Sequence, residues 1–425
     1  MKLFDKFIHI YLKIIDYCMQ RPKRIVRLVV LAGCCIIVFF QLWECVNKLL
    51  KPPVSTHSNF ELNETMHYPA ITFCRNPPFK KDIMENFNLS YHPTLTSGWK
   101  NFPFNDKTLA DVYEQATYSS DEFFRSFSLD GNSTNIKIVM SLHFTYGRCY
   151  TVIPRVTTKL PWKNSGYSIR LLNGQQNKKG YDTAMGIDEG WHMFLHMPME
   201  EFTEYGISSS GRIENLYVEF NEEIELKMSV AHYTYFRGRG TKCSDDRLKS
   251  TSACIENCIW RQVEEKVNCS GPWMKHAVFP YCNSYESIKN LINEYNSMIS
   301  SYGNEESCDC LKPCDTSIYS SFVMNRKLLE GLGHSQIYVY YTSKMVTKLS
   351  EKSGYDSSQF VADMGGSLGF LLGLSVIGLI IILEKVLGYL FLDQMVEKYM
   401  KKKNEAEQMS KKESEGAKEA KFLDM

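Results

Sequence analysis

The sequence lacks several features that would assign it to a common class of protein. Its formal net charge is only +1 over 425 residues, so nothing indicates a nucleic-acid partner. It has no GxSxG, HExxH, P-loop or protein-kinase motif, which excludes the enzymes that depend on those sites. We find no internal repeat, and we expect no enzyme, no catalytic residue, no metal site and no bound cofactor.

Long apolar runs are scarce as well. The mean hydropathy is -0.28, so most of the chain belongs in water, and only two runs reach the roughly 20 apolar residues that cross a membrane. The first is too long for a signal-peptide core and is expected to stay uncleaved. Basic residues precede the first run and follow the second, which places both termini in the cytoplasm. The expected order is cytoplasmic 1–24, membrane helix 25–46, extracellular domain 47–359, membrane helix 360–392 and cytoplasmic tail 393–425.

The second apolar run is unusual for a helix that only crosses lipid. Its first half holds an acid, four glycines and two serines, namely Asp363, Gly365, Gly366, Ser367, Gly369, Gly373 and Ser375. Glycine costs about 1 kcal/mol per helix position relative to alanine, so this density needs a reason. Glycine and serine can present carbonyls and hydroxyls to an ion, which predicts a pore lining. The alternative is that Gly365, Gly369 and Gly373 form only a helix-packing ridge.

The region between the spans is expected to be an extracellular α+β domain. Strand-like alternation covers 136–142, 216–220, 224–230 and 337–346, and helix-like runs cover 108–118, 253–266 and 287–298. His192 and His196 have metal spacing for a helix, but their stretch is strand-like and no third ligand is evident. Four sequons are candidate glycosylation sites, at Asn63, Asn88, Asn132 and Asn268.

Ten of the fourteen cysteines lie between the spans, an even number that predicts a disulfide framework. Cys254 and Cys258 share one face of a helix, and Cys308 and Cys310 share one face of an extended segment. An antiparallel arrangement would pair Cys254–Cys310 and Cys258–Cys308, leaving Cys243–Cys314, Cys269–Cys282 and Cys74–Cys149. The sequence alone does not fix this connectivity, and a zinc site at Cys308, Cys310 and Cys314 is the alternative.

Four motifs in fixed order resemble the degenerin/epithelial sodium channel family, and within it the insect pickpocket branch. They are Tyr68-Pro-Ala-Ile-Thr-Phe-Cys74, Tyr146-Gly-Arg-Cys-Tyr-Thr151, the cysteine series from Cys254 through Pro280-Tyr-Cys282 to Cys314, and Ala362-Asp-Met-Gly-Gly366 with Gly373-Leu-Ser375. The resemblance covers nearly everything from His9 to Leu392. It implies a subunit of a trimeric, amiloride-sensitive, voltage-independent sodium or cation channel of the plasma membrane. Its partners would be identical or related subunits, the lipid bilayer and an extracellular ligand. The channel would serve a chemosensory or mechanosensory cell. It would need no cofactor, and Na⁺ would be its permeant ion.

The resemblance also implies roles for particular residues. The selectivity filter would be formed by Gly373, Leu374 and Ser375. The pore mouth and gate would be formed by Ala362, Asp363 and Gly366, and the blocker contact by Gly369.

Two departures from the family pattern bear on gating. His9 corresponds to the histidine of an N-terminal His-Gly gating pair, but Ile10 replaces the glycine, and His9 could equally be a plain interfacial residue. The segment 237–243 is basic and glycine-rich where the family carries an aromatic residue before a cysteine. Acids are sparse between 283 and 307, which disfavours proton gating through paired carboxyls there. The charged pair Glu384 and Lys385 is expected to face the pore or a partner.

Two other classes are weighed against the channel family. ATP-gated receptors also have two spans and ten outer cysteines, but their cysteine spacing differs and their Asn-Phe-Arg signature is missing here. An auxiliary non-conducting subunit or a cell-surface receptor could share the same disulfide framework. Currents from the chain alone and from the chain with related subunits would separate conducting from auxiliary roles.

Overall fold

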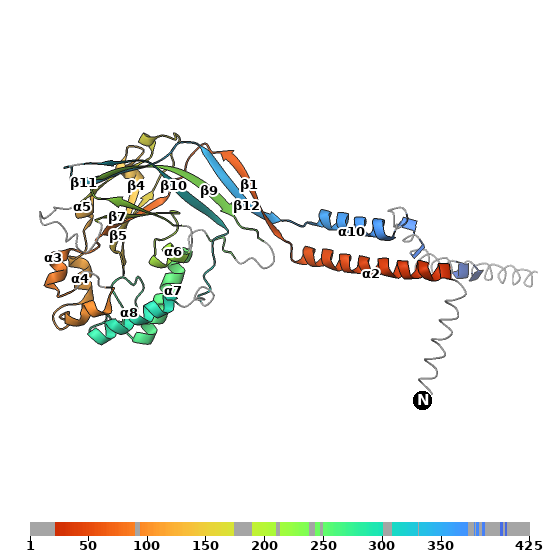
Figure 1. Ribbon diagram of the computed structural model, residues 1–425, viewed down its shortest axis with the longest axis horizontal. Coiled ribbons are helices and arrows are strands. Elements are labelled where there is room, and N and C mark those ends of the chain that lie inside the picture. Colours follow the sequence, from red (N-terminus) through yellow and green to blue (C-terminus); the bar gives the residue numbers. More distant parts are fainter. Residues whose placement is uncertain are drawn as a thin grey trace, which may run out of the picture. The chain divides into compact units, whose positions relative to one another are not determined.

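The computed structural model describes residues 22–89, 94–173, 189–209, 213–237, 243–246, 250–300, 308–329 and 331–372, with isolated positions beyond. The chain divides into two compact units. Unit 1 combines the two ends of the chain, up to Pro53 and from Ser353, and unit 2 is Val54–Lys352. Figure 1 labels the elements of both units.

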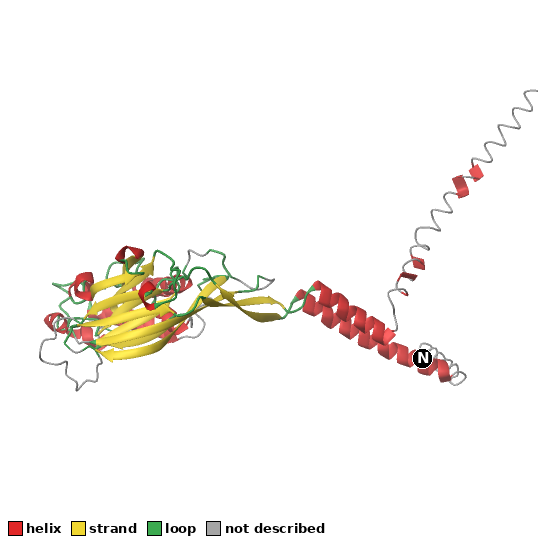
Figure 2. Ribbon diagram, turned by 90° about the horizontal axis from the view of Figure 1, so that it is seen from above, coloured by secondary structure: helices red, strands yellow, loops and turns green. Residues whose placement is uncertain are grey.

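Unit 2 contains two β-sheets among its described residues, drawn in yellow in Figure 2. The larger has the strand order β1-β12-β9-β11-β6-β3, with β10 also paired to β9. Its strands are β1 (Val54–Leu62), β3 (Phe124–Leu129), β6 (Tyr167–Leu172), β9 (Glu222–Thr234), β10 (Asp315–Leu328), β11 (His334–Tyr341) and β12 (Met345–Ser353). The smaller has the order β4-β5-β2-β7-β8, with β2 (Ala70–Asn76), β4 (Ile136–His143), β5 (Gly147–Pro154), β7 (Gly190–His196) and β8 (Glu214–Glu219).

Alternating side chains explain why the two sheets pack together. In β9 every second residue from Ile224 to Val230 is buried, while the residues between are partly or fully exposed. These residues join one apolar cluster with buried side chains of the smaller sheet. Tyr68 lies in that cluster, with its ring 5.3 Å from the ring of Tyr167 and 5.0 Å from that of Tyr341. One shared core therefore holds the two sheets together.

The helices α3 (Lys81–Asn86), α4 (Leu109–Gln115), α7 (Thr251–Val267) and α8 (Tyr285–Ser300) lie to one side of the sheets and share a second core with the 3₁₀ turn η1 (Thr96–Asn101) (Figure 1). Phe123 of α5 (Ser120–Phe123) belongs to the core of the sheets instead. The remaining short elements are α6 (Glu204–Ser209) and the 3₁₀ turns η2 (Ser133–Asn135) and η3 (Lys163–Ser165). The backbone N–H of Ala253 donates to the Ser250 hydroxyl at the start of α7, and Asn268 ends that helix with a φ of 58°. Trp260 of α7 stacks on Tyr295 of α8 with ring centroids 3.8 Å apart.

Five disulfides brace unit 2, in the pairs that the sequence predicts: Cys74–Cys149, Cys243–Cys314, Cys254–Cys310, Cys258–Cys308 and Cys269–Cys282. Four of them tie down α7, α8 and the adjoining segments. The alternative of a zinc site is wrong, because Cys308, Cys310 and Cys314 are all bonded to other cysteines. The described residues also hold no cluster of three metal-ligating side chains.

The described residues of unit 1 include two helices that pack on each other, α2 (Pro22–Leu50) and α10 (Ser357–Leu372). Within α2, the segment Ala32–Leu50 is long and apolar enough to cross a membrane, with a mean hydropathy of 1.5. Many of its large side chains are exposed, including Phe39, Phe40 and Trp43. Helix α10 covers the start of the second expected span, and most of 373–392 lies outside the described residues.

Candidate functional site: the small-residue face of helix α10

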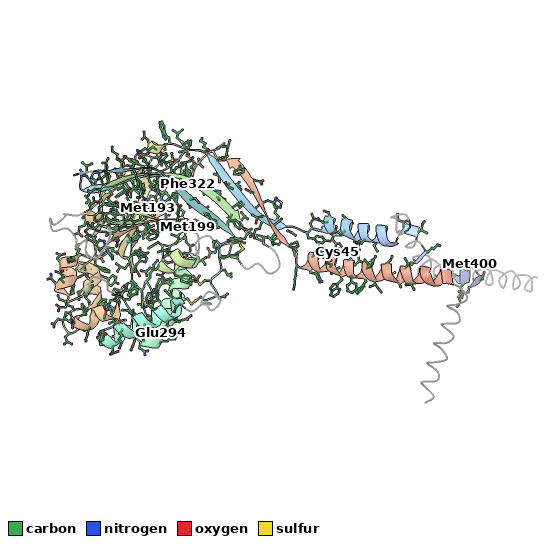
Figure 3. The ribbon with its side chains drawn as sticks, viewed as in Figure 1. Cys45, Met193, Met199, Glu294, Phe322 and Met400 are labelled. Carbon is green, nitrogen blue, oxygen red and sulfur yellow. A yellow bond between two sulfur atoms is a disulfide. The ribbon has the colours of Figure 1, made fainter. Side chains whose placement is uncertain are left out.

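Helix α2 presents one stripe of covered residues. Val38 and Cys45 are its buried side chains, at 4% and 7% exposure, and Cys34 and Leu42 are half-buried. Their spacing of three or four residues places them on one face of a helix. Cys45 lies on the side of α2 that faces α10 (Figure 3). This stripe is therefore the contact surface for α10.

Helix α10 has two different faces. The half-buried side chains of Phe360, Met364 and Leu368 recur every four residues and face α2. At about 100° per residue, the opposite face carries the exposed small residues, namely Ala362, Gly365, Gly366 and Gly369. The two stripes lie on opposite sides of the helix.

The glycines on the small-residue face are not required by packing within the described part of the chain. A Cβ atom built on Gly365 or on Gly366 meets nothing within 4 Å. Packing against α2 is therefore not the reason for Gly365 or Gly366. Their free energy cost in a helix, about 1 kcal/mol each, has to be offset by something outside this pair of helices.

Asp363 and Tyr355 mark the end of α10 that is near the β-strands in sequence. Asp363 is exposed and lies on the flank between the two faces. Tyr355, two residues before α10, is buried at 5% exposure, and its hydroxyl forms no hydrogen bond within the described residues. Burial raises the pKa of Tyr355, and so do its neighbours Cys45 and Asp363.

Several residues assigned roles from the sequence fall outside the described residues. These are His9, Gly373, Leu374, Ser375 and Glu384. Ala362, Gly366 and Gly369 lie together on the small-residue face, with Asp363 beside it. Among the sequons, Asn88, Asn132 and Asn268 are exposed and Asn63 is partly covered. Asn132 accepts hydrogen bonds from the N–H and the hydroxyl of Thr134, at 3.0 and 2.9 Å.

The two histidines with metal spacing lie on a strand. His192 and His196 both belong to β7, where four residues span about 13 Å, too far for both to ligate one ion. Nε2 of His196 is 2.8 Å from the hydroxyl of Thr72. Burial lowers the pKa of both histidines, which keeps the rings neutral.

A pair of acids in unit 2 was missed from the sequence. Glu204 begins α6 and accepts from the N–H and the hydroxyl of Thr145, at 2.6 and 2.9 Å. Glu256 on α7 accepts from the N–H of Tyr205 at 3.1 Å. Burial, followed by the charge of Glu204, raises the pKa of Glu256 to about 8. The two acids are 52 positions apart, so no local spacing reveals them.

Comparisons with known proteins show the family to which the chain belongs. The family model described as "Amiloride-sensitive sodium channel" matches residues 8–384. Degenerin del-1 of Caenorhabditis elegans is 23% identical over 302 residues, which cover 62% of this chain and 44% of that protein. The bile acid-sensitive ion channel of Rattus norvegicus is 22% identical over 428 residues, covering 88% and 83%. The epithelial sodium channel subunit gamma of Bos taurus is 24% identical over 325 residues, covering 63% and 46%.

The chain spans less than half the length of del-1 and of the bovine gamma subunit. A cryo-EM structure of a proton-activated chloride channel aligns over 87% of this chain and 99% of that chain, at 8% identity. Its TM-score of 0.34 is too low to bear on the fold.

Proposed function

The chain belongs to the amiloride-sensitive sodium channel family, and we propose on that basis that it is a subunit of a trimeric, voltage-independent sodium or cation channel. The channel lies in the plasma membrane and is blocked by amiloride. Each subunit crosses the membrane twice, with both termini in the cytoplasm. The subunit assembles with identical or related chains and serves a chemosensory or mechanosensory cell, as expected for the pickpocket branch.

The small-residue face of α10 is the structural observation that supports this proposal. Ala362, Gly365, Gly366 and Gly369 point away from the partner helix of the same chain. Small residues let helix backbones approach closely, and in a trimer they would let three copies of α10 converge on one axis. Asp363 on the flank would then contribute a ring of three carboxylates that attracts cations to the mouth of the pore.

The filter of the proposed channel follows α10 directly in the sequence. Gly373, Leu374 and Ser375 begin at the residue after the last one of α10. A Gly-x-Ser turn repeated in three copies makes a narrow ring of oxygen ligands that replaces part of the water around a small cation. Such a ring favours Na⁺ over the larger K⁺. Gly369 would lie one helical turn before the filter, where a blocker entering from outside would reach it.

Current recordings test the proposal. The chain is expressed alone and with related subunits, and Ala362→Val is compared with Val361→Leu, which adds volume outside the small-residue face. We expect Ala362→Val to hold the helices apart and to give a constitutive, amiloride-blocked current that reverses near the Na⁺ potential. Val361→Leu should behave like the parent.

The absence of current is informative when the subunits are seen at the surface. If Ala362→Val complexes containing this chain stay closed, the assignment of the gate is wrong. If the chain only alters the current of co-expressed relatives, and filter variants leave selectivity unchanged, the chain is an auxiliary subunit and the proposal of a conducting subunit fails.

A further inference from the structure

Strands β9 and β12 form a fork at one end of the larger sheet. They pair in parallel from Ala231 with Thr347 to Thr234 with Ser350. Beyond that last pair the two chains separate. The chain after β9 continues toward the disulfide-braced segment 243–314, and the chain after β12 reaches the start of α10 at Ser357. The chain that leads to α7 and α8 and the chain that leads to α10 therefore both leave the larger sheet at this fork.

One carboxylate spans this fork. Glu351 is the first residue of β12 after the last ladder pair. One of its oxygens accepts from the hydroxyl of Tyr233 at 2.5 Å, and the other accepts from the backbone N–H of Phe236 at 3.0 Å. The first donor lies inside the paired stretch of β9 and the second lies beyond it. The carboxylate therefore holds the diverging chain 235–237 to β12.

The other contacts at the fork join this same chain to the braced segment. The N–H of Tyr235 donates to the carbonyl of Cys314 at 2.8 Å, and the Lys312 ammonium lies 3.8 Å from the centre of the Tyr235 ring. Arg237 pairs with Asp245 and Asp315, at 3.0 and 3.3 Å. The disulfide Cys243–Cys314 closes the entry and exit of the segment. The chain 235–237 is thus tied to the braced segment 243–314, which carries α7 and α8, by a hydrogen bond, a cation–π contact and ion pairs.

Tyr233 and Tyr235 are aromatic residues that come shortly before the basic segment 237–243. Their ring centroids are 4.6 Å apart. They precede the first cysteine of the braced segment by ten and eight positions.

We propose that Glu351 is a positioning residue for gating, the joint through which a movement of the α7–α8 segment shifts β12 and the start of α10. This inference rests on the proposed channel function. Both hydrogen bonds have the carboxylate as acceptor, and hydrogen bonds to a charged group are among the strong ones. A displacement of the braced segment 243–314 therefore reaches β12 at Glu351. This residue precedes Ser358 of α10 by seven positions. The proposed effect depends on the two hydrogen bonds.

Hydrogen exchange of the purified full-length protein tests whether the joint exists. Glu351→Ala removes both acceptors, Tyr233→Phe removes one donor, and Glu351→Gln keeps one carbonyl acceptor on a chain of the same length. Lys352→Ala, on the next and exposed residue of β12, is the matched control. We expect amide exchange at 235–237 and 349–353 to rise about tenfold or more in Glu351→Ala, less in Tyr233→Phe and Glu351→Gln, and not at all in the control. Unchanged exchange in Glu351→Ala would overturn the proposal.

Current recordings on the same variants test whether the joint transmits movement. In the parent background, Glu351→Ala and Tyr233→Phe should change open probability per surface channel at least about threefold, with Glu351→Gln intermediate. In the Ala362→Val background, where the gate is held apart downstream, none of them should change it. A variant that only damages folding would lower the current in both backgrounds, and that result would refute the joint.

The two proposals fail in different ways. If exchange rises but open probability is unchanged in a parent that conducts, the joint does not transmit and this inference is wrong. If neither the parent nor the Ala362→Val complexes at the surface carry current, alone or with related subunits, the channel function itself is refuted, and the gating role of Glu351 falls with it.

Discussion

The partly buried acid Glu256 on α7 gives a quantitative prediction for pH. The pKa of Glu256 is raised from 4.5 to about 8, first by burial and then by the charge of Glu204. The folded protein therefore holds a proton that the unfolded chain releases above about pH 4.5. The free energy of unfolding should fall as pH rises from about 4.5 to about 8, and should level off above that.

The size of this effect has a ceiling. Each pKa unit corresponds to 1.36 kcal/mol, so a rise from 4.5 to about 8 amounts to about 5 kcal/mol. Glu256 is only partly covered, so water weakens the penalty, and we expect about 1–3 kcal/mol. Glu256→Gln removes the charge and should raise the melting temperature at pH 8 by about 2–6 °C. At pH 5 Glu256 is neutral in the folded protein, and the pH is only just above the pKa of 4.5 of the unfolded chain, so the difference should be much smaller.

Thermal melts of the purified protein at pH 5, 6, 7 and 8 measure this. Glu114→Gln, an exposed glutamate on α4, is the control and should leave the melting curve unchanged at every pH. The reasoning is refuted if the difference between Glu256→Gln and the parent is the same at pH 5 and at pH 8. Such a constant offset would mean that Glu256 is ionised, or neutral, throughout.

Three further predictions concern the framework, the filter and the surface. Cys258→Ser breaks the bond to Cys308 and should lower the free energy of unfolding by about 2–5 kcal/mol, enough to abolish surface expression. Cys45→Ser, at an unbonded thiol, should still reach the surface. Surface biotinylation compares the two variants. Ser375→Ala should lower the Na⁺/K⁺ permeability ratio, read from reversal potentials, without changing surface expression, and an unchanged ratio in channels that contain the mutant would move the filter elsewhere. Asn132→Gln should remove one glycan and speed migration on a gel, because Asn132 is exposed; no shift relative to Ser133→Ala would contradict its use.

The parts of the fold that depend on local spacing could be predicted from the sequence. The disulfide pairs follow from a helix that places Cys254 and Cys258 on one face and a segment that places Cys308 and Cys310 on one face. The helix expected at 253–266 is α7, found at Thr251–Val267. The single strand expected at 337–346 was wrong, because the apolar alternation continues through a turn that separates β11 from β12.

The parts that depend on distant residues could not be predicted. The acids Glu204 and Glu256 approach each other because α6 packs on α7, which no sequence window contains. Glu351 meets Tyr233 and Phe236 across 118 and 115 positions. The sequence also did not show which face of α10 lies against α2, because that depends on where the two helices touch.

The parallel pairing of β9 and β12 has a mechanical consequence. The chains leave the two strands at the same end, so tension that pulls these exits apart loads the ladder from that end, one hydrogen bond after another. Peeling of this kind yields at a lower force than sliding, in which all the bonds along a pair of strands share the load. The braced segment on one side of the fork contains four disulfides and resists stretching. Under tension, the hydrogen bonds of Glu351 would therefore be loaded first, and the pair of Thr234 with Ser350 next.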